Sequence, residues 1–117
     1  EGKKYNREHL ASLTAICVLK RVMSTRDMDL LIREELRGER TVEDGYIAFC
    51  ESLNSALQAM AQEMEARPED DTLADAAIHF ALISYAAGLA SSRYVSLLRE
   101  KRADETAHRS KKEKERD

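Results

Sequence analysis

The stretch of sequence that decides the fold covers residues 76–92 and reads AAIHFALISYAAGLASS. It contains no Asp, Glu, Lys or Arg, so it is apolar on every side of a helix. A membrane span is the alternative, but 17 residues are at the short limit for crossing a bilayer, and many of them are Ala, Ser or Gly. We therefore predict a central helix that is packed on several sides, begins near Leu73 and continues at least to Arg99.

The composition extends this helical prediction to the whole chain. The 117 residues are 43% hydrophobic, with one Pro and four Gly, and Ala, Leu, Glu and Arg dominate. Few breaks and many good helix formers favour long helices, and the hydrophobic content is too high for a disordered chain. The sequence predicts an all-α fold, a small helical bundle of about four helices that is dimeric.

Helix start and stop signals divide the first part of the chain. Asn6, Ser24, Thr41 and Thr72 are candidate N-caps, and the last three are each followed by Asp three residues later, which resembles a capping box. Gly38 and Pro68 are stop signals. We predict helices over residues 7–23, 26–37 and 42–66 before the central helix.

The predicted third helix has an unusually regular apolar pattern. Its apolar residues are spaced four, three, four, three and four apart: Tyr46, Cys50, Leu53, Leu57, Met60 and Met64. This spacing is typical of the contact seam of a coiled coil or of a tight antiparallel bundle.

Charge is distributed unevenly along the chain. Residues 1–98 have a net charge of −5 and residues 99–117 a net charge of +2. From Arg109 onward the sequence is a run of charges that has no apolar surface to bury. We predict a single helical domain over residues 1–108 and a charged, disordered tail over residues 109–117, which is either solvated or a contact site for an acidic partner surface.

The two cysteines lie in apolar stretches, 33 positions apart. We interpret Cys17 and Cys50 as buried free thiols, which suits a reducing compartment, although a disulfide between them is the alternative. With no signal peptide visible at the N-terminus, we expect a cytoplasmic protein.

The sequence contains none of the motifs that carry common catalytic chemistry. There is no GxSxG, P-loop, GxGxxG, CxxC or HExxH pattern. Asp75 and His79 are four residues apart and are suitable as two metal ligands, but a metal site needs further ligands, so a structural or partner-facing His79 is the preferred interpretation. We predict no catalytic residue, no cofactor and no metal, and we expect the protein not to be an enzyme.

DNA binding is a further alternative that the charge disfavours. The break at residues 23–25 is short enough for a helix-turn-helix, but the helix after it alternates positive and negative side chains. The net charge of −3 also lacks the basic character that phosphate binding needs.

What remains is apolar surface for protein partners. Ser84, Gly88 and Ser92 are spaced four apart and form a smooth stripe for another helix of the same chain or of a second copy. Tyrosines near this stripe are typical interface anchors. The predicted partner-binding residues are Tyr85, Gly88, Ser92, Tyr94 and Leu98.

A short all-helical chain whose last long helix is the apolar one, here AAIHFALISYAAGLASSRYVSLL over residues 76–98, resembles the QslA- and TraM-like antiactivators of LuxR-type quorum-sensing regulators. The resemblance implies a homodimer that binds the ligand-binding domain of a LuxR-type activator such as LasR. It also implies that binding inhibits the activator by blocking its dimerisation or DNA binding. The alternatives from other classes are a helical adaptor subunit of a larger assembly and a DNA-binding regulator.

Overall fold

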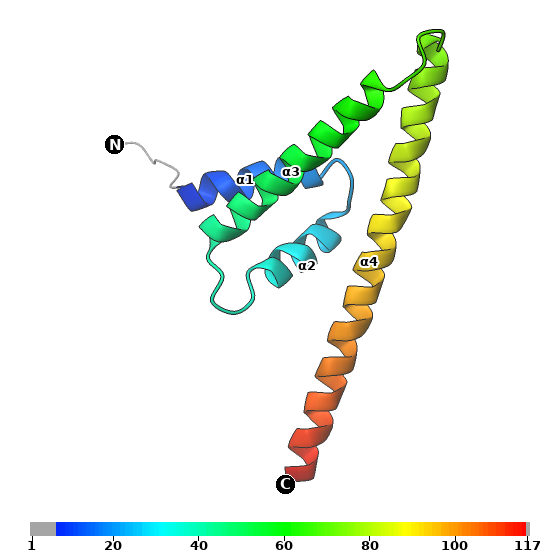
Figure 1. Cartoon of the computed structure of the whole chain (residues 1–117). Helices are drawn as coiled ribbons and strands as arrows, with labels where there is room; N and C mark the ends of the chain where they lie inside the picture. The colour runs from blue at the N-terminus through cyan, green and yellow to red at the C-terminus, as the bar shows by residue number, and fades with distance from the viewer. Residues whose placement is uncertain (1–6, 117) are drawn as a thin grey trace. The chain divides into compact units, whose positions relative to one another are not determined.

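The computed structural model describes residues 7–116, which form four helices and no strand (Figure 1). The helices are α1 (Arg7–Leu19), α2 (Thr25–Glu35), α3 (Val42–Glu65) and α4 (Leu73–Arg116). The all-α prediction is confirmed. The first helix ends earlier than expected, because backbone hydrogen bonds from Val22 and Met23 to the carbonyl of Leu19 close a turn there.

Two of the predicted helix caps are formed. The Ser24 hydroxyl accepts a hydrogen bond from the Asp27 amide at 3.1 Å, and the Thr41 hydroxyl accepts one from the Asp44 amide at 3.0 Å. Each bond satisfies an amide that has no partner inside the helix, which fixes where α2 and α3 begin. Gly38 has a φ of +76°, a left-handed conformation that turns the chain after α2. The predicted cap at Asn6 lies outside the described residues.

The described chain divides into two compact units at Thr72. The sequence had instead favoured a single helical domain over residues 1–108. The first unit contains α1, α2 and α3, and the second consists of α4 alone. Each unit is described by itself.

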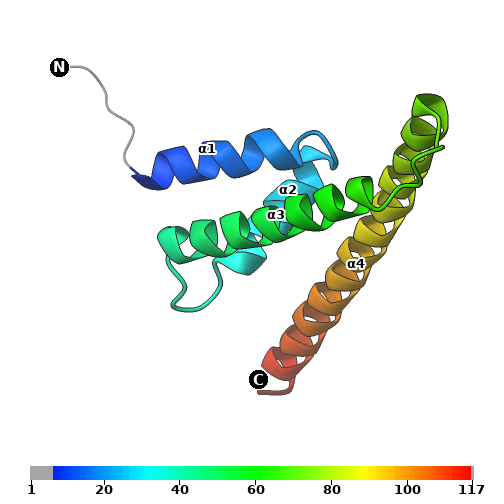
Figure 2. The same ribbon diagram turned by 45° about the horizontal axis from the view of Figure 1, so that its top comes forward.

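In the first unit, α1 packs against α3 (Figures 1 and 2). Met28 of α2 is buried. The start of α3 lies close to the end of α2, since a Cβ at Gly45 would be in contact with Cδ2 of Leu36, at 3.4 Å. Met28 is the one buried residue among the described side chains of this unit, and no residue of α3 is buried.

The second half of α3 has no equivalent cover in this unit. With a rise of about 1.5 Å per residue, α1 is about 20 Å long and α3 about 36 Å long, so α1 spans only part of α3. Cys50, Leu53 and Met60 are half-buried, whereas Leu57 and Met64 are exposed. The apolar seam predicted for α3 is therefore only partly used inside the first unit.

The second unit, α4, is 44 residues long and continues through the segment predicted to be disordered. Residues 109–116 are helical, which corrects the prediction for them, while Asp117 lies outside the described residues. The physical reason is that Lys, Arg and Glu are good helix formers, and that opposite charges recur at helical spacing, as at Arg109 and Glu113. An ion pair between Arg102 and Glu105 occupies the preceding turns.

Candidate protein-binding surface

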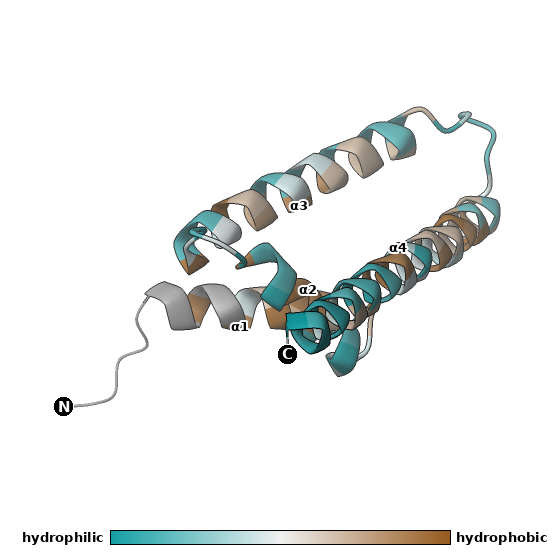
Figure 3. Ribbon diagram, turned by 90° about the horizontal axis from the view of Figure 1, so that it is seen from below, coloured by the Kyte–Doolittle hydropathy of each residue, from teal (hydrophilic) through white to brown (hydrophobic). Residues whose placement is uncertain are grey.

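The first half of α4 is an apolar helical surface that its own unit does not cover. Figure 3 shows the helix changing from apolar to polar along its length. Four of its large apolar side chains are exposed, with fractions of 58, 63, 69 and 57% for Ile78, Leu82, Tyr85 and Leu89. The expected packing of this helix on several sides is therefore not provided within the unit, since that unit is a single helix.

These exposed residues lie on one face of the helix. Ile78, Leu82, Tyr85, Leu89 and Ser92 are spaced four, three, four and three apart, and residues seven apart are nearly two full turns apart. We call this set the front stripe. Only Tyr85 and Ser92 of the front stripe were among the predicted partner-binding residues.

A second apolar face lies on the opposite side of α4. Tyr94 is nine residues from Tyr85, which is half a turn beyond two full turns at 100° per residue. The residues that share this face are Phe80, Ile83, Ala87, Tyr94 and Leu98, and we call them the rear stripe. Tyr94 is 73% exposed and Leu98 is half-buried.

The five predicted binding residues therefore do not form one surface. Tyr85 and Ser92 belong to the front stripe, and Gly88 flanks it in open space, with nothing within 4 Å of a Cβ built there. Tyr94 and Leu98 belong to the rear stripe. The front-stripe residues that the sequence analysis missed could have been predicted from their spacing. They alternate three and four residues apart, as the apolar seam of the third helix does.

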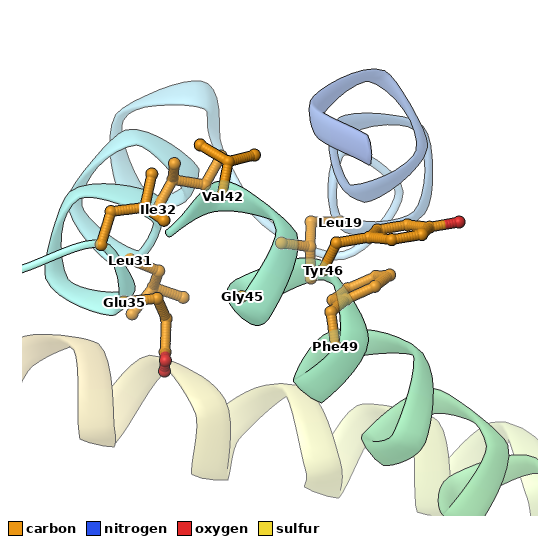
Figure 4. A pocket seen from close by; sticks show the side chains of 9 residues that line it. Leu19, Leu31, Ile32, Glu35, Val42, Gly45, Tyr46 and Phe49 are labelled. Atoms are coloured by element: carbon orange, nitrogen blue, oxygen red, sulfur yellow. The ribbon is translucent and has the colours of Figure 1, made fainter. Parts of the chain in front are cut away.

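The first unit contains an apolar pocket of about 110 Å³ (Figure 4). Its side chains come from α1, α2, α3 and the connection between α2 and α3: Leu19, Leu31, Ile32, Glu35, Leu36, Val42, Gly45, Tyr46 and Phe49. A pocket of this size and lining suits a single apolar side chain of a partner.

The polar groups of this pocket are engaged with neighbours. Glu35 forms an ion pair with Arg40 at 2.7 Å. The pKa of Tyr46 is raised above its usual value of 10.0, chiefly by a hydrogen bond with the Cys50 side chain and by the charge of that thiol on ionisation.

The residues considered for special chemistry are not brought into a cluster. The His79 ring packs edge-on against Phe80, with ring centroids 5.0 Å apart. Among the side chains that the structure describes, residue 10 and residues 13–116, no group of three or more His, Cys, Asp or Glu is placed to hold a metal ion. Both cysteines are free thiols, but Cys17 is exposed and Cys50 half-buried, so the prediction that Cys17 is buried was wrong.

Among the described residues, α4 is the one helix that has the length and composition to cross a membrane. Comparison of the chain with known protein families, curated proteins and solved structures finds no match.

Proposed function

We propose that this protein is a non-enzymatic, cytoplasmic regulator that works as a helical homodimer and inhibits a partner protein by covering its dimerisation surface. The observation that supports this proposal is that α4 forms a unit by itself and carries apolar side chains on two opposite faces. Covering contiguous apolar surface of this kind with another surface removes it from water and lowers the free energy of the system.

A protein surface suits α4 better than a lipid bilayer does. The charge-free segment of 17 residues is about 25 Å long, which is shorter than the hydrocarbon core of about 30 Å. Its Ala, Ser and Gly residues provide small side chains that let another helix approach closely. Asp75 lies directly before this segment and Arg93 directly after it. A bilayer of ordinary thickness would therefore enclose these charges in its hydrocarbon core.

Two opposite apolar faces need two covering surfaces. In the proposed arrangement a second copy covers the front stripe, which completes a helical bundle, and the partner binds the rear stripe. Tyr94 is the proposed anchor because it is a large amphipathic side chain that is 73% exposed. Leu98 lies one turn further along the same face and completes the contact.

The proposed partner is a LuxR-type activator such as LasR, the class implied by the resemblance of residues 76–98. An activator that dimerises through apolar helices offers the type of surface that an apolar helical face can cover. No covalent step is needed. Inhibition requires only that the monomeric activator binds this protein more tightly than the activator dimer does.

The test is binding of the immobilised protein to the purified ligand-binding domain of a LuxR-type activator. The wild type and the control Val22→Ala, which shortens an exposed apolar side chain outside α4, are expected to retain the domain. Tyr94→Ala is expected to weaken binding by about 30-fold, the effect of losing an interface anchor of about 2 kcal/mol.

Four outcomes would contradict the proposal. If the wild type retains no LuxR-type domain, that partner class is wrong. Equal affinity of Tyr94→Ala and Val22→Ala would remove the rear stripe from the interface. If the immobilised protein instead retains a permanent complex of several proteins from a cell lysate, the adaptor is favoured. If it retains nucleic acid with an affinity that falls steeply with salt, a DNA-binding regulator is favoured.

A further inference from the structure

The front stripe is the centre of a longer and regular contact seam on α4. Adding Asp75, Ser96 and Arg99 gives positions 75, 78, 82, 85, 89, 92, 96 and 99, with alternating intervals of three and four. This is the spacing of the contact positions in a two-stranded coiled coil. The seam covers 24 intervals, or about 36 Å of helix at about 1.5 Å per residue.

This seam is symmetric about Ala87. If two copies of α4 lie antiparallel with this residue at the midpoint, every seam position faces another seam position. The inner layers place Tyr85 opposite the second copy's Leu89, and Leu82 opposite the second copy's Ser92. The next layer pairs Ile78 with Ser96. A large side chain thus faces a small one both where Leu82 meets Ser92 and where Ile78 meets Ser96, which allows the two helices to pack closely.

The charges at the ends of the seam discriminate between the two orientations. In the antiparallel arrangement the outermost layers pair Asp75 of one copy with Arg99 of the other, an opposite-charge contact at each end. A parallel arrangement in register would instead place Asp75 beside Asp75 and Arg99 beside Arg99. Like charges at facing positions repel each other, so charge complementarity favours the antiparallel orientation.

The residues beside the midpoint permit a close approach of the two helices. Ala86 and Gly88 flank the seam on its two sides, and a Cβ at Gly88 has open space around it. The charged residues 100–116 of each copy then extend away from the paired segment at opposite ends.

We infer that two copies of this chain pair through antiparallel α4 helices along the front stripe, with a two-fold axis that passes between Tyr85 and Leu89 at the height of Ala87. This inference rests on the dimer of the proposed function and gives it an orientation and a register. The interface is isologous, since each copy contributes the same residues. It covers the exposed side chains Ile78, Leu82, Tyr85 and Leu89 of both copies.

Disulfide cross-linking tests the orientation and the register together. In a full-length background carrying Cys17→Ser and Cys50→Ser, two single variants are made, Leu82→Cys and Ser92→Cys, and oxidised separately and after mixing. Since a disulfide forms only where the two Cβ atoms are about 3.5–4.5 Å apart, the mixture is expected to form covalent dimers and each variant alone is not. Ser91→Cys mixed with Leu82→Cys is the matched control, because Ser91 is also an exposed serine but lies off the stripe.

The other outcomes overturn the inference. Cross-linking of Ser92→Cys by itself would show a parallel dimer, and equal cross-linking of Ser91→Cys would show another face or register. A monomeric mass at micromolar concentration, or protection of α4 only in phosphatidylcholine vesicles, would exclude pairing of copies. If Leu82→Cys fails to fold by circular dichroism, the pair Ile78→Cys and Ser96→Cys makes the same test in the next layer.

Failure of this inference is distinguishable from failure of the proposed function. The LuxR-type domain is offered to the same cysteine variants under reducing conditions. Retained partner binding without the expected cross-link overturns the antiparallel dimer alone. Loss of partner binding by the wild type overturns the proposed function, whatever the cross-linking shows.

Discussion

Leu89→Ala is expected to weaken self-association without destabilising the isolated chain. Leu89 lies next to the proposed two-fold axis and is 57% exposed in the single chain. Burying a whole leucine side chain contributes about 1.5–3 kcal/mol, so covering its exposed part contributes about 0.9–1.7 kcal/mol per copy. Two copies lose this contribution together, and alanine keeps a small part of it. The dimer should therefore weaken by about 1.5–3 kcal/mol, or about 10- to 150-fold in Kd.

Sedimentation equilibrium over a range of concentrations measures this dissociation constant directly. Leu73→Ala is the matched control, because it makes the same change on the same helix at a side chain that is 91% exposed and lies off the seam. Both variants exchange one good helix former for another, so their helical content by circular dichroism should remain that of the wild type. Equal dissociation constants for Leu89→Ala and Leu73→Ala would refute the assignment of the front stripe to the dimer interface.

Two further predictions concern the first unit. Thr41→Ala removes the hydroxyl that caps α3 and is expected to lower the free energy of unfolding by about 1 kcal/mol, measured by urea denaturation; an unchanged midpoint would show that the cap contributes nothing. Cys50→Ala is expected to lower the pKa of Tyr46 towards 10, because the hydrogen bond with Cys50 is the largest cause of its elevation, and NMR of the Tyr46 ring against pH measures it. Because the pKa of Tyr46 is raised in the folded state, its neutral hydroxyl contributes to the free energy of unfolding. This contribution is fully present below pH 10 and is lost as the pH rises through the folded-state pKa. The Cys50→Ala variant should therefore lose less stability than the wild type over this range.

Local signals were sufficient to predict the helices of the first unit. Ser24 and Thr41 act through hydrogen bonds to amides three residues away, so their effect is written in adjacent sequence. The extent of burial depends on distant segments. The regular seam of α3 gave no indication that α1 is too short to reach Leu57 and Met64.

The segment from Arg109 illustrates a different difficulty. Its lack of apolar residues correctly indicated that it buries nothing. A segment can nevertheless be helical without burial when its own residues have high helix propensity. Alternating charges three and four apart supply local support along residues 109–116. For the partner-binding residues, the sequence indicated the correct helix but grouped Tyr85 with Tyr94, although the helical period places them on opposite faces.

The change from an apolar to a charged half within α4 has a consequence for synthesis. The chain grows from its N-terminus, so residues 76–92 leave the ribosome before the charged residues that follow them. The 24 residues from Arg93 to Arg116 take about 1–5 s to add at about 5–20 residues per second. During this interval most of residues 76–92 is still enclosed by the exit tunnel of the ribosome. The apolar half of α4 therefore becomes accessible to other chains only together with the charged half that follows it.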